Sequence, residues 1–263
     1  MTSRAMTAVI GPNDHRLPFI VAAIGAAGMG ALLLASTVVS GLLHWVPRDV
    51  FALQTGAAAF LAFAVGLGMD VSSNRPTRIL LAGALAGAAG TALAAAVALL
   101  GPTGGRLGLS ALVAGIGIAL MLGYLLLRTP ATVPSDGIRI SRWFTWFLVW
   151  GAVASALFGF GGLVLGSTFG KLFGFAGVYD LLYRLDGGIT LGIFVGSVLA
   201  VRSRWWPEVQ PLVIVGFITN LLTLLGGVAD ATSGGGSVGL YLIMGAALFN
   251  TVGLGLGLAR SGH

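Results

Sequence analysis

One short stretch of the chain gathers ionisable side chains that could do chemistry. Asp180, Arg184 and Asp186 lie within seven residues of an otherwise apolar sequence. Asp180 and Arg184 are spaced i, i+4, so on a helix they share a face and can pair, whereas Asp186 points elsewhere. Charged groups at membrane depth are costly and mark functional sites, but an acidic residue also stabilises a helix N-terminus. The stretch therefore predicts either a functional site or an interfacial helix start.

A second set of polar groups lies in the middle of apolar segments near the C-terminus. Thr219 and Asn220 occupy one such segment, and Asn250 and Thr251 occupy the next. In apolar helices, these side chains bond to a neighbouring helix at roughly 0.6–2 kcal/mol each. They predict either packing contacts between two helices or contacts to a polar solute.

The sequence contains few of the residue sets that bind cofactors or metals. It has no cysteine, and its histidines, His15, His44 and His263, are not placed to face one another from two helices. The single lysine, Lys171, lies at a predicted helix boundary. Nucleotide-binding loops, HExxH and Ser/His/Asp sets are also missing. We expect no cofactor and no metal site.

The composition is that of a protein in lipid. Apolar residues make up 57% of the 263 residues and charged residues 8%, whereas soluble domains carry roughly 25% charged residues. A chain this poor in charge cannot cover a globular surface with polar side chains. The net charge of +6 comes from single basic residues in short loops, so we expect membrane lipids and no nucleic acid as partners.

Eight segments are long and apolar enough to cross a bilayer as helices, which takes roughly 20 residues each. The fold class is therefore all-α, a polytopic bundle of about eight transmembrane helices. The predicted spans are Leu17–Leu43, Phe51–Met69, Ile79–Gly101, Leu107–Leu127, Trp143–Phe169, Gly177–Val201, Val209–Val228 and Val238–Leu258.

The basic residues predict how the bundle is oriented. With the N-terminus inside, ten arginines fall on the inner side and four basic residues on the outer side. This bias follows the positive-inside rule and puts both termini on the cytoplasmic side of a cell membrane. The first apolar run is too long for a cleaved signal peptide, so we expect it to be retained as a helix.

The two halves of the chain align without gaps at an offset of 131 residues. Ser36-Thr37 matches Ser167-Thr168, Asp49 matches Asp180 and Pro76 matches Pro207. We therefore expect two four-helix repeats in the same orientation, residues 1–134 and 135–263, related by an axis along the membrane normal. Small residues spaced four apart predict close helix packing or a glycine-lined conduit: Gly83/Gly87, Gly162/Gly166, Gly170/Gly174 and Gly192/Gly196.

The second half resembles a known family of bacterial membrane proteins. Tyr183-Arg184-Leu185-Asp186-Gly187 followed by Arg202-Ser203 is similar to the turn and short loop of four-helix DoxX-like and DUF4345-type proteins. The first half departs from the pattern, with Leu53-Gln54-Thr55-Gly56 at the corresponding place. The resemblance implies a four-helix unit, here in tandem, and implies no reaction.

Three functions fit these residues. The first is a non-catalytic accessory or scaffold component that binds another membrane protein or forms a homo-oligomer. The second is a small-solute transporter or channel whose polar pathway uses Asp180, Arg184, Asp186, Asn220 and Asn250. The third is an enzyme acting on a lipid or isoprenoid, with Asp180 or Asp186 as general acid and Tyr179 and Tyr183 shaping an aromatic pocket.

Overall fold

Helices account for nearly all of the structure, a computed structural model that describes residues 16–38, 50–73, 77–101, 105–130, 138–234 and 236–260. Within these ranges there is no strand, only a single backbone bridge between Arg139 and Trp205. Eight of the described helices are long and apolar enough to cross a membrane, and α7 is a short ninth element. In chain order the helices are α1 (Arg16–Val38), α3 (Val50–Ser73), α4 (Arg78–Leu99), α5 (Gly105–Arg128), α6 (Arg142–Leu165), α7 (Ser167–Leu172), α8 (Asp180–Ser203), α9 (Trp206–Thr232) and α10 (Val238–Arg260).

The expected all-α bundle with eight apolar spans is confirmed. Most boundaries agree with the predicted ones to within four residues, because each span must cover the same hydrocarbon thickness. The predicted end of the first span at Leu43, and the repeat positions Asp49 and Pro76, lie outside the described residues.

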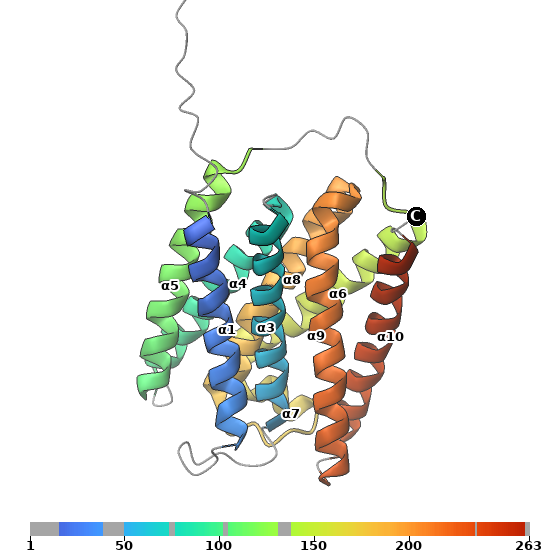
Figure 1. Cartoon of the computed structure of the whole chain (residues 1–263). Helices are drawn as coiled ribbons and strands as arrows, with labels where there is room; N and C mark the ends of the chain where they lie inside the picture. Colours follow the sequence, from blue (N-terminus) through green and yellow to red (C-terminus); the bar gives the residue numbers. More distant parts are fainter. Residues whose placement is uncertain are drawn as a thin grey trace, which may run out of the picture.

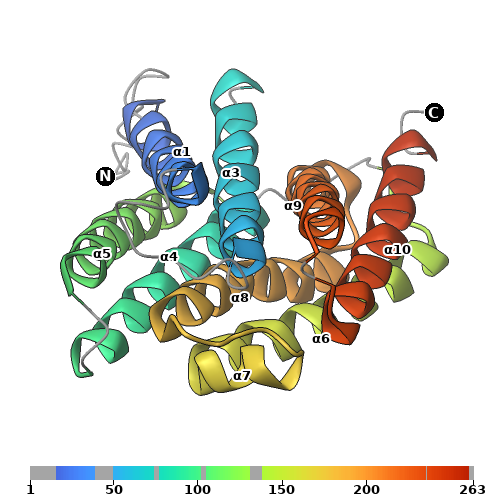
Figure 2. The same ribbon diagram turned by 90° about the horizontal axis from the view of Figure 1, so that it is seen from below.

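The spans form two layers of four helices, which Figures 1 and 2 show from the side and from below. One layer contains α1, α3, α9 and α10, and the other contains α5, α4, α8 and α6. Within each layer neighbouring helices pack extensively, whereas contacts between the layers are fewer. The start of α1 and the end of α10 lie at the same end of the bundle, called here the terminal end, and α7 lies at the opposite end, called the α7 end (Figure 1).

Helices α4 and α8 join the two halves of the chain through a close contact between glycines. Gly83 and Gly87 of α4 face Gly192 and Gly196 of α8, so that a Cβ placed on Gly83 would lie 2.9 Å from the carbonyl oxygen of Gly192. Lipid provides no hydrophobic drive for helix association, and close backbone approach supplies dispersion contacts instead. The predicted packing role of these four glycines is confirmed.

In the other two predicted glycine pairs, Gly162 and Gly170 pack closely against α8 as predicted. Gly166 and Gly174 have a different role, which is a correction to the sequence analysis. The predicted span Trp143–Phe169 is interrupted at Gly166, which has φ 54° and ψ −129° and separates α6 from α7. Gly174, with φ 78°, lies in the turn after α7. Glycine adopts positive φ without steric cost, so these two residues end helices instead of packing them.

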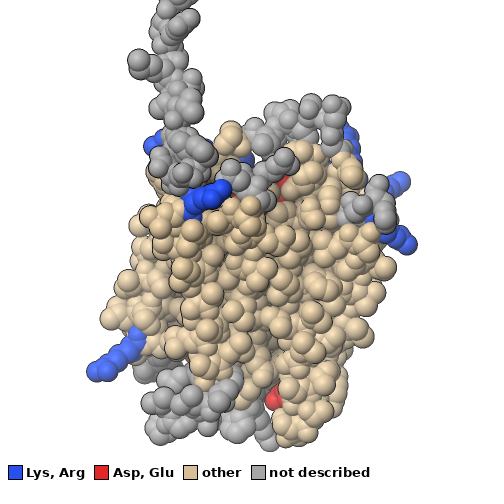
Figure 3. Space-filling view, in the orientation of Figure 1, with Lys and Arg blue, Asp and Glu red and all other residues tan. Residues whose placement is uncertain are grey.

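Charged side chains lie toward the two ends of the bundle. The face seen in Figure 3 carries its Lys, Arg, Asp and Glu side chains near these ends, with a broad uncharged band between them. Large apolar side chains such as Leu120, Val153 and Leu242 are exposed on the spanning helices. Eight helices long and apolar enough to cross the hydrocarbon core of a bilayer carry this surface, and the chain is a multi-pass integral membrane protein.

Candidate functional site

A cavity of about 180 Å³ lies between the two layers in the second half of the chain. The layer of α6 and α8 lines one side, the layer of α9 and α10 lines the other, and the first turns of α3 contribute Phe51, Ala52 and Thr55. Roughly 10–15 Å³ suffices for one water molecule, so the cavity can hold a small organic molecule.

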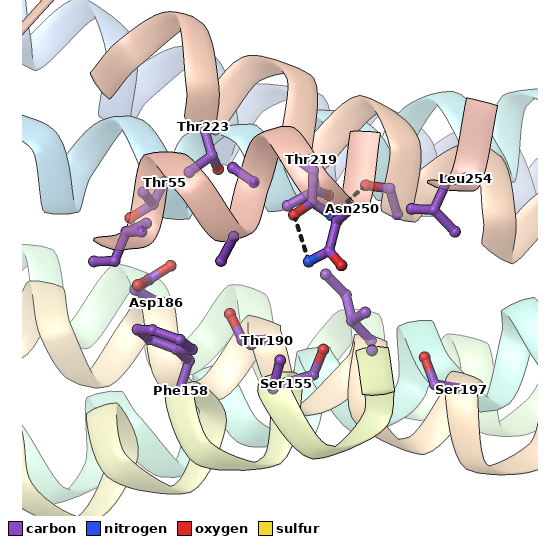
Figure 4. A pocket seen from close by; sticks show the side chains of 18 of the residues that line it. Thr55, Ser155, Phe158, Asp186, Thr190, Ser197, Thr219, Thr223, Asn250 and Leu254 are labelled. Carbon is purple, nitrogen blue, oxygen red and sulfur yellow. Dashed lines mark hydrogen bonds between the residues drawn. The ribbon is translucent and has the colours of Figure 1, made fainter. Parts of the chain in front are cut away.

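Asp186 is the one charged residue among the described residues that line this cavity. It lies six residues into α8, which is about 9 Å from the α7 end of that helix. Its side chain packs beside Gly56 of α3, and Figure 4 shows it close to Thr55 and Phe158. Asp186 makes no ion pair with any residue that the structure describes.

An asparagine pair lies deeper in the same cavity. Asn250 of α10 donates from Nδ2 to Oδ1 of Asn220 on α9 at 3.1 Å, and Asn220 donates to the carbonyl oxygen of Gly216 at 2.7 Å. The predicted bond between these neighbouring helices is therefore confirmed. Asn250 Oδ1 is buried and has no hydrogen-bond partner among the described residues, so it leaves a free acceptor beside the cavity (Figure 4).

Hydroxyl groups complete the polar part of the lining. Thr190 and Ser197 continue the face of α8 that carries Asp186, and Ser155 faces them from α6 (Figure 4). Thr219 lines the opposite side and donates its hydroxyl proton to the carbonyl oxygen of Val215 at 2.9 Å. Since that proton is committed within its own helix, Thr219 presents lone pairs to a solute.

Aromatic rings surround the cavity at its α7 end. Phe158, Phe169 and Phe173 pack edge to face or tilted, with ring centroids 5.0–5.7 Å apart. Phe51 and Phe175 stack at 5.6 Å, and both line the same cavity. Tyr183 also contributes to the lining and packs over Gly170, where no larger residue would fit. The cavity is thus polar along its sides and aromatic at one end.

Asp180 and Arg184 pair as predicted, but neither residue lines the cavity. Arg184 Nε donates to Asp180 Oδ2 at 2.5 Å, and Arg184 Nη1 donates to the carbonyl oxygen of Leu163 at 2.7 Å. Asp180 Oδ1 accepts from the backbone N–H of Ser167 at 2.9 Å. The pair therefore binds the last carbonyl groups of α6 and the first amide of α7 to the start of α8.

Of the polar residues singled out in the sequence, the structure brings Tyr183, Asp186, Thr219, Asn220 and Asn250 to one cavity. Tyr179 precedes α8 and packs against the core of the first half instead. The sequence analysis missed the phenylalanines and Thr190. Asp186, Thr190, Ile193 and Ser197 follow helical spacing along one face, so this periodicity could have identified the α8 side of the site.

Asp70, at the terminal end of α3, is a further buried carboxyl that the sequence analysis did not identify. Its Oδ2 accepts from the backbone N–H of Thr77 at 2.9 Å and from the Thr77 hydroxyl at 3.2 Å. It connects α3 to the start of α4 and lies outside the cavity.

The first half encloses a space of a different kind. Helices α1, α3, α4 and α5, with Ile189 of α8, surround a cavity of about 30 Å³ that is almost entirely apolar. The residues 131 positions before the polar lining groups Thr190, Thr219, Thr223, Asn220 and Asn250 are all alanine, namely Ala59, Ala88, Ala92, Ala89 and Ala119. Apart from Thr55 of α3, the polar groups that line the larger cavity belong to the second half.

The fold and this cavity define the class of the chain as a multi-pass α-helical membrane protein with a buried polar and aromatic site. No protein-family profile, no curated protein and no solved structure matches the chain. Among the described residues, no three His, Cys, Asp or Glu side chains come together.

Proposed function

We propose that this protein is a membrane carrier for a small solute, which binds in the cavity of the second half. The observation that carries the proposal is the convergence of Asp186, Asn220 and Asn250, from three spanning helices, on one interior space. Polar groups in a membrane interior are costly. Several polar groups around a cavity large enough for a molecule offset this cost when a solute in the cavity forms hydrogen bonds with them.

The first half supports this proposal as an internal comparison. Helices of similar length there pack around a small apolar space, with alanine at the positions that correspond to five of the polar lining groups. Packing alone therefore has no need of the amides and hydroxyls. An accessory subunit or scaffold would require only the packing, so the cavity favours solute binding over that function.

An enzymatic function has weaker support. Asp180, one of the two candidate acids, is bound to Arg184 and Ser167 outside the cavity. Asp186 faces the cavity, but the polar groups around it are amides and hydroxyls that can bind a solute and are not paired for proton relay. The geometry thus favours binding and release over a chemical step.

We also propose that the chain consists of two four-helix repeats in tandem, with the boundary near residue 134. Helix pairings support it: α1 packs on α3 as α6 packs on α8, and α4 packs on α5 as α9 packs on α10. Between the halves, α3 on α9 corresponds to α8 on α4. Each of these three helix contacts therefore has a counterpart between the helices that lie 131 residues further along or back in the sequence. The resemblance to four-helix DoxX-like proteins stays a prediction.

For the orientation, we propose that the protein lies in the cell membrane with its terminal end on the cytoplasmic side. Eight described arginines lie at or beyond helix ends on that side, whereas the described part of the α7 end has three basic residues, Arg106, Lys171 and Arg184. The positive-inside rule supports this assignment. The solute cavity would then have its aromatic end toward the outside.

Cysteine accessibility tests the carrier proposal, because the chain contains no native cysteine. Ser155→Cys places a thiol in the cavity, and Val153→Cys places one on the exposed, lipid-facing side of the same helix, where Val153 is 59% exposed. A membrane-impermeant thiol reagent reacts with thiolates in water. We expect Ser155→Cys to react when the reagent is added from either side of the membrane, and Val153→Cys to stay unreacted.

Solute uptake by proteoliposomes gives a second measurement. Asn220→Leu and Asn250→Leu should lower uptake, and Thr251→Val, which changes a residue outside the cavity lining, should not. Equal reactivity of Ser155→Cys and Val153→Cys, or uptake that is unchanged in both asparagine variants, would overturn the proposed pathway.

A further inference from the structure

We propose that the solute is an organic cation, an amine or ammonium compound with apolar substituents. This inference rests on the proposed function, since it assigns a substrate class to the same cavity. It is drawn from the charge, the hydrogen-bonding direction and the aromatic content of the lining.

The charge of the lining has one sign. Asp186 supplies a carboxyl group, and the described lining contains no Lys, Arg or His side chain that could balance it. Arg184, the nearest basic residue in sequence, is engaged by Asp180 and by the carbonyl groups of α6. A carboxylate without a countercharge is costly in a membrane interior, and a cationic solute would supply that countercharge. An anionic solute would find no countercharge.

The hydrogen-bonding groups point in the same direction. Asn220 uses its Nδ2 for the Gly216 carbonyl oxygen, so its Oδ1 faces Asn250 and takes the Nδ2 of that residue. Asn250 Oδ1 is consequently left as an acceptor, buried and without a partner among the described residues. With Thr219 also committed as a donor, this side of the cavity presents acceptors. Each of the two amide nitrogens keeps a second N–H, but the buried acceptor that has no partner suits a solute that donates, as an ammonium N–H does.

The aromatic end explains the apolar substituents. Phe158 lies next to Asp186 (Figure 4), and Phe169 and Phe173 pack against Phe158 with centroids 5.7 and 5.4 Å away. Aromatic faces attract cations, more strongly when both are removed from water. A carboxyl group beside several rings therefore suits a cation whose charge is carried by nitrogen and whose remaining surface is hydrocarbon.

Binding of a matched pair of probes to the detergent-solubilised full chain tests the inference. The probes are 2-phenylethylamine, which is a cation at neutral pH, and 2-phenylethanol, which has nearly the same shape and no charge. We expect calorimetric titration to show roughly tenfold or greater preference for the amine. The preference should disappear in Asp186→Asn.

Asp230→Asn is the matched control, because it makes the same change on a spanning helix outside the cavity. It should keep the preference for the amine. Phe158→Leu provides a variant that leaves Asp186 in place, and it should weaken amine binding more than alcohol binding. The comparison of the two probes on the unaltered protein stands even if Asp186→Asn does not fold.

Three results would overturn the inference: equal binding of both probes, retention of the amine preference in Asp186→Asn, or stabilisation by sodium ions with no binding of the amine. None of these bears on the cysteine accessibility of Ser155→Cys, which tests the carrier function separately. If the amine binds and Ser155→Cys reacts with the thiol reagent from neither side of the membrane, the cavity is a cation-binding site in a protein that is not a carrier.

Discussion

Substituting Gly192 by alanine should destabilise the bundle, because this glycine lies at the contact between α4 and α8. A Cβ at this position would lie 2.6 Å from the carbonyl oxygen of Gly83 and 3.0 Å from Cα of Gly87. Ordinary van der Waals contact begins at 3.4 Å, so the shortfall is 0.8 Å. Both neighbouring atoms belong to backbone, which cannot rotate away, and the two helices must separate.

The cost follows from that separation. A gap of about 0.5–1 Å removes roughly a quarter to a half of the dispersion attraction between facing atoms, and overpacking typically costs about 1–3 kcal/mol. Against this, alanine favours a helix by up to about 1 kcal/mol over glycine. We expect a net loss of about 1–2 kcal/mol, or a fall in melting temperature of roughly 2–8 °C for a chain of this size.

Thermal unfolding of the purified protein in detergent, followed by tryptophan fluorescence, measures this change. Gly117→Ala is the matched control, since a Cβ on this exposed glycine of α5 would meet nothing within 4 Å. Gly83→Ala should resemble Gly192→Ala, and the double variant should cost less than the sum, because the first substitution already separates the helices. If Gly192→Ala melts at the same temperature as Gly117→Ala, the proposed close contact is wrong.

Two further predictions concern polar groups outside the cavity. Asp180→Ala should lower the free energy of unfolding by about 1–3 kcal/mol, since it removes the partner of Arg184 and of the Ser167 amide. The preference for the amine over the alcohol should not change. An altered preference with normal stability would place Asp180 in the site. Asp70→Ala should lower the free energy of unfolding by a similar amount, because the Thr77 amide loses its buried acceptor. Asp70→Asn keeps an acceptor oxygen and should lower the melting temperature less in the same assay. Equal melting temperatures for the two variants would contradict this role of Asp70.

Local features of the site could be predicted from the sequence. The pairing of Asp180 with Arg184 follows from their spacing on one helix face and is present. The bond between Asn220 and Asn250 follows from the cost of an unpaired amide in an apolar helix, and is also present. In both cases the relevant partner is either four residues away or one of few polar groups at the same depth.

The wider lining of the site could not be predicted in this way. Phe51 of α3 and Phe158 of α6 are ordinary apolar residues in their own segments, yet both line the cavity with Asp186. Nothing in either segment distinguishes a phenylalanine beside a cavity from one that faces lipid. The role of Gly166 as a helix end, where the sequence suggests packing, was hidden for a similar reason, since the helix ends there against Asp180, which lies in the next span.

The sequence by itself determined that the chain crosses a membrane about eight times, because a polypeptide with so few charged residues can satisfy its backbone and its surface only as helices in lipid. Tertiary structure alone decided which faces of those helices meet, and hence that Asp186 looks into a cavity and Asp180 does not. The physical reason is that lipid chains are as apolar as a protein interior. A spanning helix therefore has no polar face to mark its outside, and its neighbours are chosen by shape.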